Sequence, residues 1–174
     1  MEIQVALSTI AEVAMSLAGF IGLLLAIAPT RHDTRQAFFR AAAIVSACFV
    51  LVVGTLLPSA LLETGLTAQS AFGFSAVFVG IGFMCVGVSL SIAGRKGIFK
   101  SAAPIFSMVL RVPSWGLAFF LVLAPILCQG LSMPALLVFA CLWFLTVVGA
   151  YFLLSILWVI QNQRLAEGGD NYSA

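Results

Sequence analysis

Residues 8–26 most constrain how this chain can fold, because they are apolar over a length that crosses a lipid bilayer and carry one carboxylate, Glu12. Similar apolar runs follow along the whole chain of 174 residues, of which 63% are hydrophobic and 8% are charged. An ordinary soluble domain carries about 25% charged residues. The runs are too long and alternate too poorly for the strands of an outer-membrane barrel, whereas helices satisfy their own backbone hydrogen bonds in lipid. The sequence therefore predicts an all-α integral membrane protein.

Polar and proline-containing breaks divide the chain into five predicted transmembrane helices, which form one domain over residues 1–160. The predicted spans cover residues 4–28, 37–62, 71–93, 112–131 and 135–160. The first apolar segment is too long for a signal peptide and no basic residue precedes it, so we expect it to be retained as a spanning helix. Residues 161–174 are polar and contain glycine and acids, which predicts a disordered tail.

The start of the fourth span has two interpretations. Pro113 suits the first turn of a helix, which favours a start near Val112. Arg111 would then extend into the headgroups beside Trp115. The alternative starts the helix near Ile105 and places Arg111 inside the membrane.

The basic residues predict the orientation, because lysine and arginine are enriched in the cytoplasmic loops of membrane proteins. With five spans, all 8 lysine and arginine residues fall on one side of the membrane: Arg31, Arg35, Arg40, Arg95, Lys96, Lys100, Arg111 and Arg164. We therefore expect the N-terminus outside and the C-terminus in the cytoplasm, in the cell membrane, which in a bacterium is the inner membrane. The net charge of +2 relates to this topology, so we expect no nucleic-acid partner.

The third predicted span carries small residues at seven-residue spacing on two opposite faces. Gly73, Gly80 and Gly87 recur on one face, and Ser75 and Gly82 lie on the other. Small residues let helix backbones approach closely in a membrane, so this spacing predicts a neighbouring helix on both faces. The alternative is coincidence, since glycine is common in membrane helices.

The first span gathers small and polar residues on one narrow face. At about 100° per residue, this face contains Ser8, Glu12, Met15, Ser16, Gly19, Gly22 and Ala26. The opposite face carries Ile10, Val13, Leu17, Ile21 and Leu24. We expect the small face, with Gly19 and Gly22 as packing positions, to point inward against other helices, and the aliphatic face to meet lipid.

No pattern in the sequence predicts catalysis, a metal site or a cofactor. The four cysteines lie singly on different predicted helices and lack the spacing of metal or redox pairs, which favours packing thiols: Cys48, Cys85, Cys128 and Cys141. The one histidine, His32, lies in a charged loop and is expected to be solvated. Paired carboxylates, zinc-protease motifs and nucleophile elbows are not found in the sequence, so we expect neither enzyme activity nor a cofactor.

Glu12 is therefore the functional candidate, with Ser8 and Ser16 one turn away on either side. Counted from Gln4, it is predicted to lie about 12 Å into the membrane, in the outer half. A carboxylate at that depth is costly unless it is protonated or partnered. It could hydrogen-bond a neighbouring helix near Pro58, bind or conduct a cation or proton, or lie near the headgroups if the span starts elsewhere.

Two functions stay open from the sequence. The first is a homo-oligomeric channel or small transporter for a cation or proton, with a ring of Glu12 side chains in the lipid bilayer. The second is a non-catalytic anchor, assembly or sensor subunit that serves a membrane or cytoplasmic protein partner. The loops are too short for a separate soluble domain, which slightly favours the first function.

Overall fold

The computed structural model of the chain describes residues 2–27, 34–95, 104–127 and 132–169, and these residues form five α-helices. The helices are α1 (Glu2–Ile27), α2 (Thr34–Glu63), α3 (Ala68–Arg95), α4 (Pro104–Leu127) and α5 (Met133–Gly169). The predicted all-α class is confirmed.

Four of the helices are long and apolar enough to cross a membrane. The apolar segments are Glu2–Leu23, Ala41–Glu63, Ala68–Ile92 and Met133–Leu157, and α4 contributes a shorter one, Val112–Leu127. Each of the four matches or exceeds the roughly 20 residues that a bilayer requires. This is the composition of a multi-pass membrane protein.

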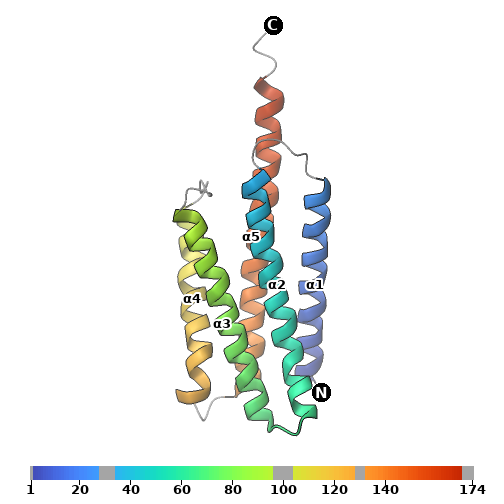
Figure 1. Ribbon diagram of the computed structural model, residues 1–174, viewed down its shortest axis with the longest axis vertical. Helices are drawn as coiled ribbons and strands as arrows, with labels where there is room; N and C mark the ends of the chain where they lie inside the picture. The colour runs from blue at the N-terminus through green and yellow to red at the C-terminus, as the bar shows by residue number, and fades with distance from the viewer. Residues whose placement is uncertain (1, 28–33, 96–103, 128–131, 170–174) are drawn as a thin grey trace.

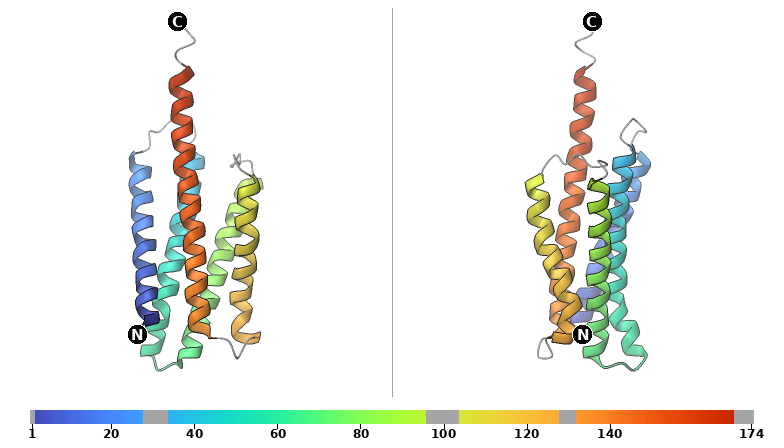
Figure 2. Two further views of the ribbon diagram at one scale, coloured as in Figure 1. Left: turned by 180° about the vertical axis from the view of Figure 1, so that it is seen from behind. Right: turned by 60° about the vertical axis from the view of Figure 1, so that its left-hand side comes forward.

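Helices α1 to α4 stand side by side in chain order, and α5 packs against all four of them (Figures 1 and 2). Within the described chain, α1 contacts α2 and α5 but neither α3 nor α4. The N-terminal end of α1 lies at one end of the bundle, and the last turns of α5 extend beyond the other end (Figure 1).

The turn between α2 and α3 is closed by local hydrogen bonds. The amide of Gly65, in the left-handed region at φ 86°, donates to the carbonyl oxygen of Leu62 at 3.0 Å. Glycine occupies this conformation without the strain that a Cβ atom would cause. The Thr67 hydroxyl then accepts from the amide of Ser70 at 3.4 Å, as a helix N-cap does. This short turn makes α2 and α3 antiparallel neighbours.

The core lies where α5 meets the row of the other four helices. Its largest fully buried apolar side chains come from α2, α3, α4 and α5: Leu51, Val79, Leu121, Met133, Leu137 and Phe144. The ring of Phe144 stacks on Phe83 of α3. Two buried hydroxyls, those of Thr55 and Ser75, donate to carbonyl oxygens of their own helices.

Helix α3 lies between α2 and α4, and its glycines face both of them. A Cβ atom on Gly80 would lie 2.7 Å from the carbonyl oxygen of Ala118, and one on Gly87 would lie 3.0 Å from the ring of Trp115. Gly73 faces Pro125 of α4 as well. On the opposite side, Gly82 packs directly against the side chain of Val50 in α2.

Two expected boundaries differ in the structure. Helix α4 begins at Pro104 and not near Val112, because Pro104 suits the first position of a helix, and Pro113 then lies inside it. Helix α5 continues past residue 160, the expected end of the last span, to Gly169, and the disorder of the tail stays a prediction. A helix already formed by 28 preceding residues extends without a further nucleation cost. His32, Cys128 and residues 170–174 lie outside the described residues.

Candidate functional site

Glu12 lies in the N-terminal half of the first helix. Helix α1 begins at Glu2, so ten residues of helix place Glu12 about 15 Å from its start. Helix α1 has 26 residues, so 15 residues of helix follow Glu12. Glu12 therefore lies inside an apolar helix, closer to its N-terminal end.

The Glu12 side of α1 faces outward in the single chain, so the expectation that it points inward is wrong. The whole predicted small face that the structure describes is exposed or points away from the core: Ser8, Glu12, Met15, Ser16, Gly19 and Gly22. The buried face consists of Leu7, Ile10, Ala11, Ala14 and Ile21. Val13 is 42% exposed, whereas Ile10 and Ile21, predicted to meet lipid, are each only 4% exposed.

Alanines explain why α1 packs with this face inward. Ala11, Ala14 and the half-buried Ala18 recur along the buried side, so α1 already presents small residues to its neighbours there. Because lipid tails are as apolar as leucine, the hydrophobic effect does not favour placing aliphatic side chains between helices over exposing them to lipid. Close packing therefore determines which face of α1 points inward, and both faces carry small residues that permit it.

The Glu12 carboxylate has no hydrogen-bond or ion-pair partner among the residues that the structure describes. A hydrogen bond from Glu12 to α2 near Pro58, one of the three sequence interpretations, is not found in this part of the chain. The hydroxyl of Ser16 donates to the backbone carbonyl oxygen of Glu12 at 2.8 Å, and that of Ser8 donates to the carbonyl oxygen of Val5 at 2.9 Å. Both hydroxyls are thus held by their own helix.

The glycines of this face have no close neighbour. A Cβ atom on Gly19 or Gly22 would meet nothing within 4 Å. By contrast, a Cβ atom on Gly80 of α3 would collide with the backbone of α4. We call the exposed surface formed by Ser8, Glu12, Met15, Ser16, Gly19 and Gly22 the Glu12 face. Its small residues leave the α1 backbone accessible from outside the chain.

Sequence reasoning missed a polar contact between α4 and α5. The indole Nε1 of Trp143 donates to the hydroxyl of Ser114 at 3.2 Å. The Tyr151 hydroxyl on α5 is also buried, without a hydrogen-bond partner in the described chain. Aromatic residues are common in membrane helices, so neither residue carries a signal in the sequence that distinguishes it from a packing residue.

The cysteines and acids do not assemble a second site in the part of the chain that the structure describes. Cys48 and Cys141 are buried free thiols, and Cys85 is an exposed one. Within these residues, no group of three or more histidine, cysteine, aspartate or glutamate side chains is placed to hold a metal ion.

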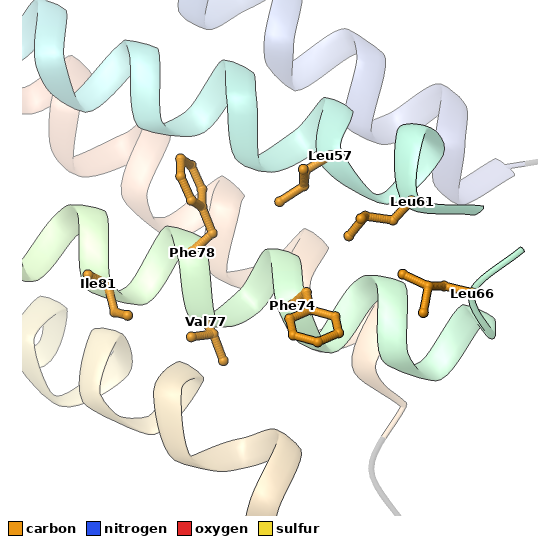
Figure 3. A pocket seen from close by; sticks show the side chains of 7 residues that line it. All are labelled: Leu57, Leu61, Leu66, Phe74, Val77, Phe78 and Ile81. Atoms are coloured by element: carbon orange, nitrogen blue, oxygen red, sulfur yellow. The ribbon is translucent and has the colours of Figure 1, made fainter. Parts of the chain in front are cut away.

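An apolar groove of about 590 Å³ lies between α2 and α3 (Figure 3). Its walls are Leu57, Leu61, Leu66, Phe74, Val77, Phe78 and Ile81. All seven side chains are hydrocarbon, so the groove can take an acyl chain but offers no side-chain group that would recognise a polar ligand. The Glu12 face is therefore the candidate functional site.

In comparisons with family models, curated proteins and solved structures, nothing matches this chain.

Proposed function

We propose that this protein is a homo-oligomeric channel or small transporter in which Glu12 carries a cation or proton across the membrane. One observation supports the proposal most: the Glu12 carboxylate lies within an apolar helix, ten residues from its start, faces out of the chain and has no partner among the described residues. Ionisable residues inside membranes are rare and usually face a protein interior or a wet path. Glu12 therefore requires a cover that the described residues of its own chain do not supply.

A second copy of the chain is the cover that we propose. Placing an ionised carboxylate among acyl chains costs free energy, about 2.5 kcal/mol or more at the centre of a helix. If the Glu12 faces of several copies meet around an axis, the carboxylates leave the lipid and line a common path. The open backbone at Gly19 and Gly22 permits the close approach that such an assembly needs.

The proposed topology has five spans, with the N-terminus outside and the C-terminus in the cytoplasm. Helix α4 has 24 residues, about 36 Å of helix, which is sufficient to cross a hydrocarbon core of about 30 Å. Arg35 near the start of α2 and Arg95 at the end of α3 lie at one end of the bundle, with Arg164 on the extension of α5 beyond it. Glu2 and Glu63 mark the other end. This distribution supports the cytoplasmic assignment of the first end.

A second function, that of an accessory subunit, has one observation in its favour. Helix α5 has 37 residues, of which its apolar segment ends at Leu157, and the last turns project beyond the bundle (Figure 1). A projecting helix gives a cytoplasmic partner a surface to bind. As an accessory subunit, the protein would anchor that partner or act as its sensor, and it would pass no ions itself.

Ion flux in liposomes separates the two functions. We expect purified wild-type protein to dissipate an imposed ion gradient, and Glu12→Gln, which keeps the size of the side chain but cannot ionise, to lose that flux. Glu63→Gln is the matched control, because Glu63 is a carboxylate at the end of a different helix, α2. Folded, oligomeric wild-type protein that passes no ion, or a Glu12→Gln variant with wild-type flux, would contradict the proposed function.

A further inference from the structure

The apolar groove between α2 and α3 begins at the turn that joins these helices and runs along both of them (Figure 3). Leu66 of the turn lines its outer end, and Ile81 of α3 lines its inner end. The two helices supply the apolar segments Ala41–Glu63 and Ala68–Ile92, so the turn between them belongs at a membrane surface. Phe74 and Ile81 are 60% and 49% exposed, so the groove opens toward lipid.

The length of the groove matches one leaflet of a bilayer. From Ala68 to Ile81, helix α3 rises about 20 Å. The hydrocarbon core of a bilayer is about 30 Å thick, so the acyl chains of one leaflet span about 15 Å, and the headgroup layer adds about 5 Å. A phospholipid whose headgroup lies beside the turn would therefore follow the groove and end near Ile81.

The volume of the groove suits a hydrocarbon chain and not a helix. A helix about 10 Å in diameter fills roughly 1,600 Å³ over about 20 Å, whereas the groove measures about 590 Å³. Water finds no hydrogen-bond partner among the seven hydrocarbon side chains that line it. A chain that fills the groove gains dispersion contacts with Phe74, Val77 and Phe78.

The charge around the turn distinguishes among lipid headgroups. Residues 41–94, which contain the turn and the helix ends beside it, include no lysine, arginine or histidine, and Glu63 ends α2. An anionic headgroup would therefore be repelled at this end, whereas a zwitterionic one has no net charge. The hydroxyls of Thr67 and Ser70 are hydrogen-bonded to each other at 2.9 Å, which uses one of their two hydrogens and leaves the other for a headgroup oxygen.

We infer that this groove binds one acyl chain of a zwitterionic phospholipid, whose headgroup lies at the Thr67 and Ser70 hydroxyls. Ser70 lies one turn before Phe74 on the same face of α3, which puts its hydroxyl at the mouth of the groove. The lipid joins α2 to α3 along a seam that the side chains leave open. This site shares no residue with the Glu12 face, so the inference does not depend on the proposed function.

Native mass spectrometry of the full-length chain tests the lipid site. When phosphatidylethanolamine and phosphatidylglycerol with the same acyl chains are added in equal amounts, we expect the wild type to retain one phosphatidylethanolamine. Val77→Phe, which fills the groove, should lose that lipid. Val88→Phe is the matched control, because it makes the same change on α3 beyond Ile81, at a side chain that is 44% exposed, and it should retain the lipid. Leu57→Phe narrows the groove from α2 and replaces Val77→Phe if that variant does not fold.

A second variant tests where the headgroup lies. Ser70→Lys places a cation at the mouth of the groove and should shift the preference toward phosphatidylglycerol; an unchanged preference would overturn the headgroup position. Wild-type protein that retains no phospholipid, or a folded groove-filling variant that retains it as the wild type does, would overturn the site. A groove-filling variant that loses its oligomeric state and keeps its lipid would assign the groove to a second copy of the chain instead.

Discussion

Phe83 on α3 and Phe144 on α5 stack with their ring centroids 3.8 Å apart and their planes 11° apart. Phe144 is fully buried and belongs to the helix that contacts all the others in the described chain. The pair therefore joins the row of α1 to α4 to the helix that packs against it. Aromatic pairs of this kind contribute about 0.5 to 1.5 kcal/mol beyond the burial of their area.

The first prediction concerns this pair. Phe144→Ala should lower the free energy of unfolding by about 3 to 5 kcal/mol, because it removes a buried ring and leaves a cavity. Phe139→Ala is the control on the same helix, since Phe139 is 61% exposed, and it should have little effect. Thermal or denaturant unfolding in detergent measures both. Equal losses for the two variants would show that Phe144 is not in the core.

The second prediction concerns the contact between α3 and α4. Gly80→Ala places a Cβ atom 2.7 Å from the carbonyl oxygen of Ala118, which can move only with the backbone of α4. We expect a loss of about 1 to 3 kcal/mol, and failure to assemble for Gly80→Leu. Gly116→Ala meets nothing within 4 Å and should be neutral or stabilising by about 0.5 to 1 kcal/mol. Unfolding of the purified variants in the same detergent tests this difference.

The helices themselves can be predicted from the sequence, because each long apolar run satisfies its backbone only as a helix in lipid. The opposite placement of Gly80 and Gly82 also predicts a neighbour on each face of α3, and the structure shows that these neighbours are α4 and α2. The start of α4 cannot be predicted from the sequence. Pro104 and Pro113 both suit the first turn of a helix, and the sequence alone does not decide between them.

The orientation of α1 could not be predicted for a physical reason. Periodicity indicates which residues share a face, so Ser8, Glu12 and Ser16 were placed together, and the structure places all three outward. It does not indicate which face meets the bundle when both carry small residues. Ala11 and Ala14 lie on the buried face, and the contacts of α1 with α2 and α5 are needed to show which face is buried.

The third prediction concerns topology. Cysteines introduced at Thr67, in the turn between α2 and α3, and at Ser132, just before α5, should react with an impermeant thiol reagent in intact cells. A cysteine at Ser173 should react only after permeabilisation. The native cysteines are replaced by alanine in all variants to remove background. Protection of both Thr67→Cys and Ser132→Cys from outside would contradict the proposed orientation.

The measurement that tests the central claim most directly is cross-linking of the Glu12 face between copies in the membrane. In a chain whose native cysteines are replaced by alanine, Ser16→Cys lies one turn from Glu12 on that face. Leu142→Cys on α5, which is 49% exposed and lies on a different helix from the Glu12 face, is the control. If copies meet through the Glu12 face, a short thiol cross-linker should convert the Ser16→Cys chain into dimers and leave the Leu142→Cys chain monomeric. A Ser16→Cys chain that stays monomeric, or that cross-links no better than Leu142→Cys, would contradict the account.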